Sequence, residues 1–239
     1  MLWAAGAALG YLLLRGWPQL SLTAVLAPWW LASEYLVRHE REVPYAVFSF
    51  LLLVAFSYLT ALWPERAPSD ERRALCVLGA VAVLPLGILA AAVPLSDHRR
   101  PPPADWSTAM IWVLAFLLPL GVALLLRGSK AWMNVLAALW VAVLALATHA
   151  HWTLAVHAWC ALGAAGLIAW GMRELRSERI NLGVAAFAIT VLFFYFSSVM
   201  DKLGRSASLI GLGILFLAGG WGLEQGRRRL VAQMRGGRP

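Results

Sequence analysis

Long apolar runs, each separated from the next by a short polar connection, make up most of the chain. The runs are about twenty residues long, which is the length an α-helix needs to span about 30 Å of hydrocarbon. Strands of a membrane barrel would be shorter and would alternate polar with apolar side chains. The pattern therefore predicts an all-α fold, a polytopic bundle of transmembrane helices.

We expect nine apolar segments: Leu2–Leu14, Pro18–Val37, Tyr45–Trp63, Ala74–Leu95, Ala109–Leu126, Ala131–Thr148, Trp152–Met172, Ile180–Met200 and Ala207–Gln225. The first would make only about 20 Å of helix, so it could span at a tilt or insert halfway. No basic residue precedes it, which is not typical of a signal peptide. We expect the other eight to span, so that residues 1–239 form a single integral membrane domain.

Composition agrees with this pattern and leaves no room for a soluble domain. The chain is 61% hydrophobic and 13% charged, whereas soluble domains are about one-quarter charged. The longest polar stretch, near residues 96–108, is short enough to be a loop.

The Lys and Arg residues predict the orientation, because short cytoplasmic loops carry an excess of them. One face of the predicted bundle carries six of the 20, which are Arg38, Arg41, Arg99, Arg100, Lys202 and Arg205. The other carries fourteen, which are Arg15, Arg66, Arg72, Arg73, Arg127, Lys130, Arg173, Arg176, Arg179, Arg227, Arg228, Arg229, Arg235 and Arg238. We expect the second face, and with it the C-terminus, to be cytoplasmic.

The formal net charge of +8 then belongs to the inner face, since the acidic residues divide evenly between the faces. A basic inner face suits anionic membrane lipids as partners. The arginines are dispersed among short loops, so we expect no nucleic-acid partner. Other membrane proteins are the remaining partners that we expect.

One stretch, "ATHAHWTLAVHAWC" at residues 147–160, concentrates histidine and cysteine, which are common metal ligands. The weak metal candidates are His149, His151 and His157. His151 and His157 diverge if both are helical, because six residues turn a helix by about 240°. A polar corner at the membrane interface is the alternative, and we favour it because amphipathic rings are enriched there.

All five histidines are predicted to lie on the outer side, as are Glu34, Asp97 and Asp201. The candidate ligand-binding residues of this outer face are Glu34, Arg38, His39, Asp97, His151 and Asp201. Glu34 precedes Arg38 by four residues, the favourable order for an ion pair within a helix. We expect each of these side chains to reach the membrane interface separately. We favour this interpretation over a shared outer vestibule in which Glu34 would act as an acid or ligand.

The middle of each predicted helix is almost free of ionisable residues, which proton-coupled transporters and ion channels usually need. The chain also lacks GxSxG, P-loop, HExxH and GxGxxG motifs. We therefore predict no catalytic residues and no cofactor. Cys76 and Cys160 are expected in different leaflets and should not form a disulfide.

A weak internal repeat is visible. "LLLRG" occurs at residues 12–16 and again at 124–128. This offset would lay four helices of residues 1–112 over four of residues 113–207, with an extra last helix. Transporters use such parallel repeats, but five shared residues give this one little weight.

Residues 181–230 carry a set of short motifs: Asn181-Leu182-Gly183, Phe187-Ala188, Tyr195-Phe196, Leu203-Gly204-Arg205-Ser206, Gly220-Trp221 and Leu223-Glu224. This part of the chain resembles the C-terminal part of the bacterial membrane family catalogued as domain of unknown function 2157. The resemblance implies a multi-pass protein of the bacterial inner membrane and no established reaction. Members of the family often have Arg before the Tyr-Phe pair and Asp after it, where this chain has Phe194 and Ser197.

Three interpretations of function remain open. The leading one is a non-enzymatic inner-membrane protein that serves as a scaffold or assembly subunit of an envelope process. The second is a transporter or flippase of a lipid or lipid-linked substrate with an outer-face cavity. The third is an outer-face membrane enzyme or metal-binding protein, which would require Glu34 and the histidines to converge.

Overall fold

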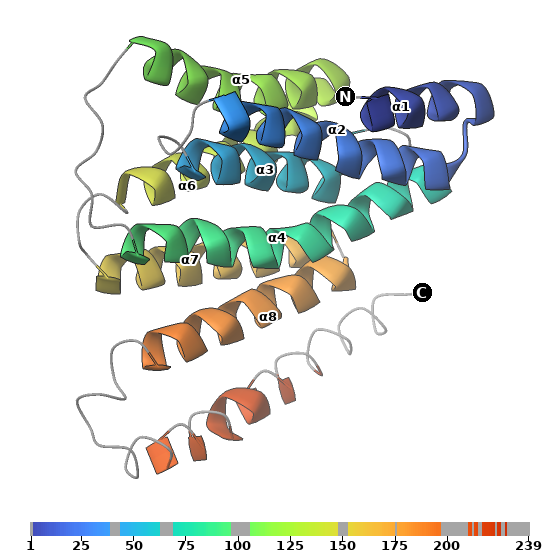
Figure 1. Cartoon of the computed structure of the whole chain (residues 1–239). Helices are drawn as coiled ribbons and strands as arrows, with labels where there is room; N and C mark the ends of the chain where they lie inside the picture. The colour runs from blue at the N-terminus through green and yellow to red at the C-terminus, as the bar shows by residue number, and fades with distance from the viewer. Residues whose placement is uncertain are drawn as a thin grey trace, which may run out of the picture. The chain divides into compact units, whose positions relative to one another are not determined.

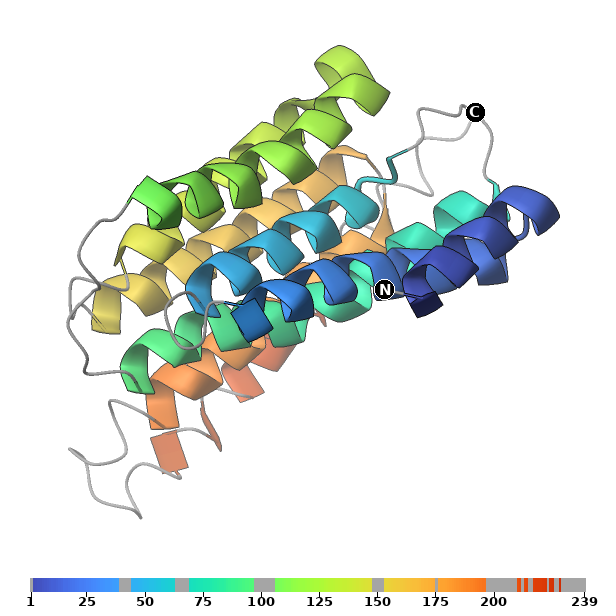
Figure 2. The same cartoon turned by 45° about the horizontal axis from the view of Figure 1, so that its top comes forward.

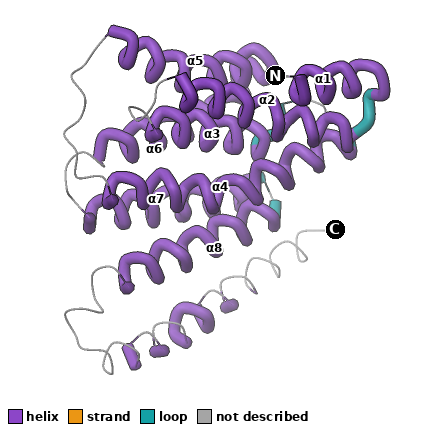
Figure 3. The backbone as a smooth tube through the Cα atoms, in the orientation of Figure 1, coloured by secondary structure: helices purple, strands orange, loops and turns teal. Residues whose placement is uncertain are grey.

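A computed structural model of the chain describes residues 2–38, 44–62, 69–96, 106–147, 153–174 and 176–196. It also describes positions 210, 211, 213, 214, 217–222, 224, 225 and 228. In these residues all regular structure is helical and no strand occurs (Figures 1 and 3). The predicted all-α fold is therefore confirmed for the described part of the chain.

The described ranges up to residue 196 contain eight α-helices and one short 3₁₀-helix. They are α1 (Leu2–Leu14), α2 (Trp17–Arg38), α3 (Pro44–Leu59), α4 (Asp70–Ser96), α5 (Trp106–Arg127), η1 (Gly128–Ala131), α6 (Trp132–Ala147), α7 (Thr153–Arg173) and α8 (Ser177–Phe194). Each of the eight α-helices coincides closely with one of the first eight predicted segments. The ninth, Ala207–Gln225, is described only in part, so the count of nine stays a prediction.

Within the described residues, five helical stretches are long and apolar enough to cross a membrane. Four lie in the helices α2, α4, α7 and α8, and the fifth, Trp106–Leu146, covers α5, η1 and nearly all of α6. Gly128 divides that stretch, because its positive φ of 56° is a left-handed conformation that α-helices do not continue through. The remaining apolar helices, Leu2–Leu14 and Tyr45–Leu59, are shorter.

The chain divides into two compact units, Met1–Phe187 and Ala188–Pro239. Within the first unit, α3 packs against α2, α4, α5 and α6. Its side chains Leu52 and Leu53 join Val83 of α4, Val141 of α6 and Leu167 of α7 in the largest buried apolar cluster. The turned view in Figure 2 shows α3 among these helices. The centre of the first unit is thus built around a helix of only 16 residues.

Small residues fill the interior, and large apolar residues cover much of the outside. Alanine is the commonest buried apolar residue in the described part of the chain. Leucine, valine and tryptophan side chains such as Leu14, Trp29, Val81 and Leu125 are exposed. Membrane helices pack in this way, because small residues let backbones approach closely while lipid solvates large apolar side chains.

Gly79 shows how close this approach is. A Cβ atom on Gly79 of α4 would lie 2.4 Å from the Leu59 backbone nitrogen and 2.5 Å from the Ala55 carbonyl oxygen. No side chain larger than hydrogen fits there without separating α4 from the C-terminal end of α3. This glycine therefore sets the distance between the two helices.

Polar side chains also join neighbouring helices. The Tyr58 hydroxyl of α3 donates to the Ala24 carbonyl of α2 at 2.9 Å. Trp140 of α6 and Trp159 of α7 each donate their indole N–H to the other's carbonyl oxygen, both at 3.0 Å. Such bonds satisfy the polar tips of otherwise apolar side chains.

In the second unit, the described residues form helical turns. The Tyr195 and Phe196 rings meet edge to face, with their centroids 5.9 Å apart. Further along, Arg228 Nε lies 2.9 Å from Glu224 Oε1, an ion pair of the i, i+4 type.

Candidate functional site

The C-terminal end of α3 is the centre of the most extensive set of polar contacts described. Ala61 has a positive φ of 53°, and its N–H donates to the Tyr58 carbonyl at 2.8 Å. The Leu59 carbonyl instead accepts from Arg179 Nη2 at 3.0 Å, and the Cys76 thiol lies 3.6 Å from it. A guanidinium at this position both satisfies an end carbonyl and complements the negative end of the helix dipole.

The turn between α7 and α8 brings Arg179 to this end. The Arg176 N–H donates to the Gly171 carbonyl at 2.9 Å, which closes the end of α7. A Cβ on Gly171 would lie 2.8 Å from the Ile180 nitrogen, so glycine allows α8 to start directly beside α7. Glu174 lies in this turn and Arg179 lies in the first turns of α8, which places the two side chains together.

Glu174 holds Arg179 through several contacts. Its Oε2 pairs with Arg179 Nη1, while its Oε1 accepts from the Trp170 indole N–H at 2.7 Å. The Arg179 guanidinium also lies over the Trp170 ring, 4.5 Å from the centroid. Arginine side chains suit such sites, because their planar group can stack and donate at once.

The pair is unequally exposed. The Arg179 side chain is 2% exposed and the Glu174 side chain 36%. Burial acts to raise the pKa of Glu174, but the Trp170 hydrogen bond and the Arg179 charge and hydrogen bond together lower it below its ordinary value. The carboxylate is therefore ionised at neutral pH and compensates the buried guanidinium.

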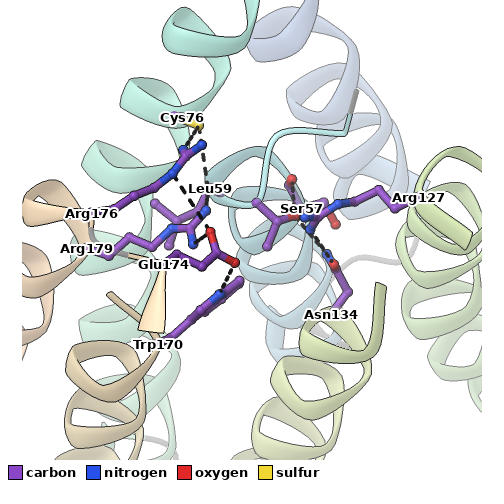
Figure 4. A network of polar contacts seen from close by, with 10 residues as sticks. Ser57, Leu59, Cys76, Arg127, Asn134, Trp170, Glu174, Arg176 and Arg179 are labelled. Atoms are coloured by element: carbon purple, nitrogen blue, oxygen red, sulfur yellow. Dashed lines mark hydrogen bonds and ion pairs between the residues drawn. The ribbon is translucent and has the colours of Figure 1, made fainter. Parts of the chain in front are cut away.

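A second series of hydrogen bonds connects α5 and α6 to the C-terminal end of α3. Arg127 Nη1 donates to Asn134 Oδ1 at 3.1 Å, and Asn134 Nδ2 donates to Thr60 Oγ1 at 3.2 Å. Thr60 in turn donates to the Ser57 carbonyl at 2.7 Å. Asn134 and Thr60 are both buried. The end of α3 is thus tied to α5 and α6 on one side and to α7 and α8 on the other (Figure 4).

We call this set the polar network; its members are Ser57, Leu59, Thr60, Cys76, Arg127, Asn134, Trp170, Glu174, Arg176 and Arg179. Its carboxylate has a lowered pKa, whereas a general base works best when its pKa lies near the operating pH. Its most buried cation is bonded to a carboxylate and to a backbone carbonyl. The contacts of the network suit the fixing of helix ends better than proton transfer.

The predicted outer-face pair is present in α2. Arg38 donates to Glu34 Oε1 through Nε at 3.0 Å and Nη2 at 2.7 Å. The side chains are 70% and 45% exposed respectively. The pair matches the i, i+4 interpretation of these two residues.

The other outer-face candidates, His39, Asp97, His149, His151 and Asp201, lie outside the described residues. His157 is described and half-buried in α7, one turn before the half-buried Cys160. Within the described ranges, no group of three His, Cys, Asp or Glu side chains is placed to hold a metal ion. Both cysteines are free thiols. The shared vestibule and the metal site therefore stay predictions.

Sequence reasoning missed the polar network. The predicted eighth segment began at Ile180, which left Arg179 in a loop, whereas α8 begins at Ser177. Ser177 followed by Glu178 is a helix-start signal that would have placed Arg179 inside the helix. Burial of Arg179 could not be inferred, because it depends on the end of α3, 120 positions away in the sequence.

Comparison of the chain with protein-family models, with curated proteins and with solved structures finds no match. The polar network and the helix packing are the features of the structure that bear on its function.

Proposed function

We propose that the protein is a non-enzymatic, multi-pass protein of the bacterial inner membrane that serves as a scaffold or assembly subunit of an envelope process. Helices of membrane-spanning length support the membrane location. So does the packing, in which alanines are buried and leucines, valines and tryptophans are exposed. Such an exterior needs lipid or other apolar helices around it.

The observation that supports the scaffold role is the set of contacts made by Arg179. It is the largest fully buried side chain among the described residues, and a buried charge in a membrane protein is by default functional. Here its hydrogen bonds go to Glu174 of the α7–α8 turn and to the end of α3. This use of a buried charge favours a protein that holds helices in fixed positions over one that moves protons or ions.

We also propose membership of the family of domain of unknown function 2157 and a cytoplasmic C-terminus. The resemblance of residues 181–230 supports the first. The fourteen basic residues of one predicted face support the second. Arg127, Arg176 and Arg179 of that set lie in one polar network, as residues of the same membrane side would. A C-terminal alkaline phosphatase fusion should be inactive, and an active fusion would reverse the proposed orientation.

Copurification tests the scaffold role. The full chain, tagged and expressed at native level, is extracted from native membranes in mild detergent, and its bound proteins and lipids are identified by mass spectrometry. A scaffold should retain one or more membrane proteins in fixed ratio, and deleting its gene should lower their abundance. Retention of a lipid-linked molecule without any protein partner would favour the transporter interpretation instead.

A further inference from the structure

Pro28 interrupts the backbone hydrogen bonding in the middle of α2. Proline has no N–H, so the carbonyl four residues earlier, that of Ala24, has no donor within the helix. Ala24 is only 8% exposed, and an unpaired carbonyl is costly where water cannot reach it. The middle of α2 therefore needs a hydrogen-bond donor from outside the helix.

Tyr58 of α3 supplies that donor. Its hydroxyl donates to the Ala24 carbonyl at 2.9 Å. Tyr58 lies in the last turn of α3, next to Leu59, whose backbone nitrogen would lie 2.4 Å from a Cβ atom on Gly79 of α4. The donor thus belongs to a closely packed pair of helices, α3 and α4, and the acceptor belongs to α2.

The chain before Pro28 forms a helical hairpin. Only Arg15 and Gly16 separate α1 from α2, and the Arg15 N–H donates to the Tyr11 carbonyl at 2.8 Å. Helix α1 packs mainly against α2 (Figure 1). We call residues 2–27, which are α1 and the first half of α2, the N-terminal arm. Because α1 is joined so closely to α2, it must follow any movement of that half.

The N-terminal arm is attached to a helix that bends easily. Beside the tyrosine hydrogen bond, Leu20 and Ala24 of the arm pack against Leu75 of α4. Within the arm, the Thr23 hydroxyl donates to the Gln19 carbonyl at 2.9 Å, a contact that often bends helices. Helices also bend at proline, where the ladder of hydrogen bonds is broken. The proline of α2 is therefore the point about which the arm can turn.

We propose that Pro28 is a hinge, that the Tyr58 hydroxyl is its latch, and that the N-terminal arm pivots away from α3 and α4 when the latch opens. With the latch closed, the Ala24 carbonyl is paired and the arm covers Leu75. With the latch open, a buried acceptor loses its donor, which places the open state at higher free energy. The hinge does not depend on the scaffold role, because it involves only contacts within the first unit.

Spin labels measure the position of the arm directly. The full chain carries Leu13→Cys in α1 and Val77→Cys in α4, which are both exposed positions. The native Cys76 and Cys160 are replaced by serine so that only the two new sites are labelled. Double electron–electron resonance in detergent micelles should give one distance for this labelled parent, in which the latch is closed.

Two further changes then open the latch and remove the hinge. Tyr58→Phe should add a population at longer distance. Combining it with Pro28→Ala should remove that population, because the substitution restores the N–H that the Ala24 carbonyl lacks. An unchanged single distance in Tyr58→Phe, or a second population that persists after Pro28→Ala, would overturn the proposal.

Melting temperatures give a second readout that needs no labels. Tyr58→Phe should lower the melting temperature of the natural chain by about 2–4 °C, since it leaves a buried carbonyl unpaired. In the Pro28→Ala chain the same change should lower it by less than about 1 °C. Equal decreases in the two chains would show that the hydroxyl does not serve the proline, and the proposal would fail.

Pro119→Ala is the matched control, since Pro119 also lies inside a helix, α5. The carbonyl four residues before it belongs to Ala115, which packs against Ala46 near the start of α3. Ala46 is about 18 Å along α3 from Tyr58. Tyr58→Phe should therefore lower the melting temperature equally with and without Pro119→Ala. A rescue by Pro119→Ala as large as that by Pro28→Ala would contradict a specific latch.

Discussion

Two glutamate–arginine pairs in this chain use the same chemistry in different surroundings. Glu34 and Arg38 lie one turn apart on α2, with side chains 45% and 70% exposed. Glu174 and Arg179 join the α7–α8 turn to the first turns of α8, and the arginine is 2% exposed. The first pair follows from spacing within one helix, whereas the second depends on α3 and α7 being in place beside α8.

The surroundings decide what each pair contributes. An exposed i, i+4 pair stabilises a helix by about 0.3–0.5 kcal/mol, because water competes for both charges. A buried pair has a small net effect as a whole, but removing one partner leaves an uncompensated charge and costs about 3–5 kcal/mol. Glu34–Arg38 is thus dispensable for folding, and Glu174 is required once Arg179 is buried.

The largest effect is expected from Glu174→Gln. This change keeps an acceptor for the Trp170 indole but leaves the Arg179 guanidinium without its carboxylate. We expect a loss of about 2–3 kcal/mol in the free energy of unfolding, lower than for a fully buried pair because Glu174 is partly exposed. Denaturant titration in mixed detergent micelles would measure it, and a loss below about 0.5 kcal/mol would contradict the structural role.

Gly79→Ala tests whether the close packing of α4 on α3 holds the α3 end in place. The new Cβ would meet backbone atoms of Leu59 and Ala55, which cannot move aside as a side chain would. We expect a destabilisation of about 1–3 kcal/mol. Gly87→Ala on the same helix is the control, since nothing lies within 4 Å of its Cβ position. Equal melting temperatures for the two variants would show that the helices are not held at this distance.

Acidification should destabilise the protein through the buried pair. The pKa of Glu174 is lower in the folded protein than its ordinary value of 4.5, so its ionised form contributes stability above that value. This contribution is lost as the pH falls below about 4.5 and through the folded pKa. The melting temperature should therefore drop over this range in the parent protein and less in Glu174→Gln. If the melting temperatures of the two proteins fell equally over this pH range, the result would contradict a stabilising role for the ionised Glu174.

The smallest effect is expected from Glu34→Gln. Its partner Arg38 is largely exposed and can be solvated by water or headgroups. The free energy of unfolding should change by less than about 0.5 kcal/mol. A loss comparable to that of Glu174→Gln would mean that Glu34 has further partners on the outer face, as the shared-vestibule interpretation requires.

The difference between the pairs also explains what the sequence could predict. Helix positions follow from local apolar runs, so Leu2–Leu14 agrees with α1 at both ends and the later segments differ by a few residues. Glu34–Arg38 follows from a spacing of four. The hydrogen bond between Asn134 and Thr60 joins residues 74 positions apart and cannot be found from spacing. Contacts among helix ends require the packing of several helices, which no local pattern contains.

Double-mutant cycles on the two pairs test the central claim most directly. The first combines Glu174→Gln with Arg179→Met, and the second combines Glu34→Gln with Arg38→Met, all measured as free energies of unfolding under one condition. We predict a coupling energy of about 2 kcal/mol for Glu174 and Arg179 and less than about 0.5 kcal/mol for Glu34 and Arg38. Similar small couplings for both pairs would contradict the conclusion that the buried charge holds the helix ends together.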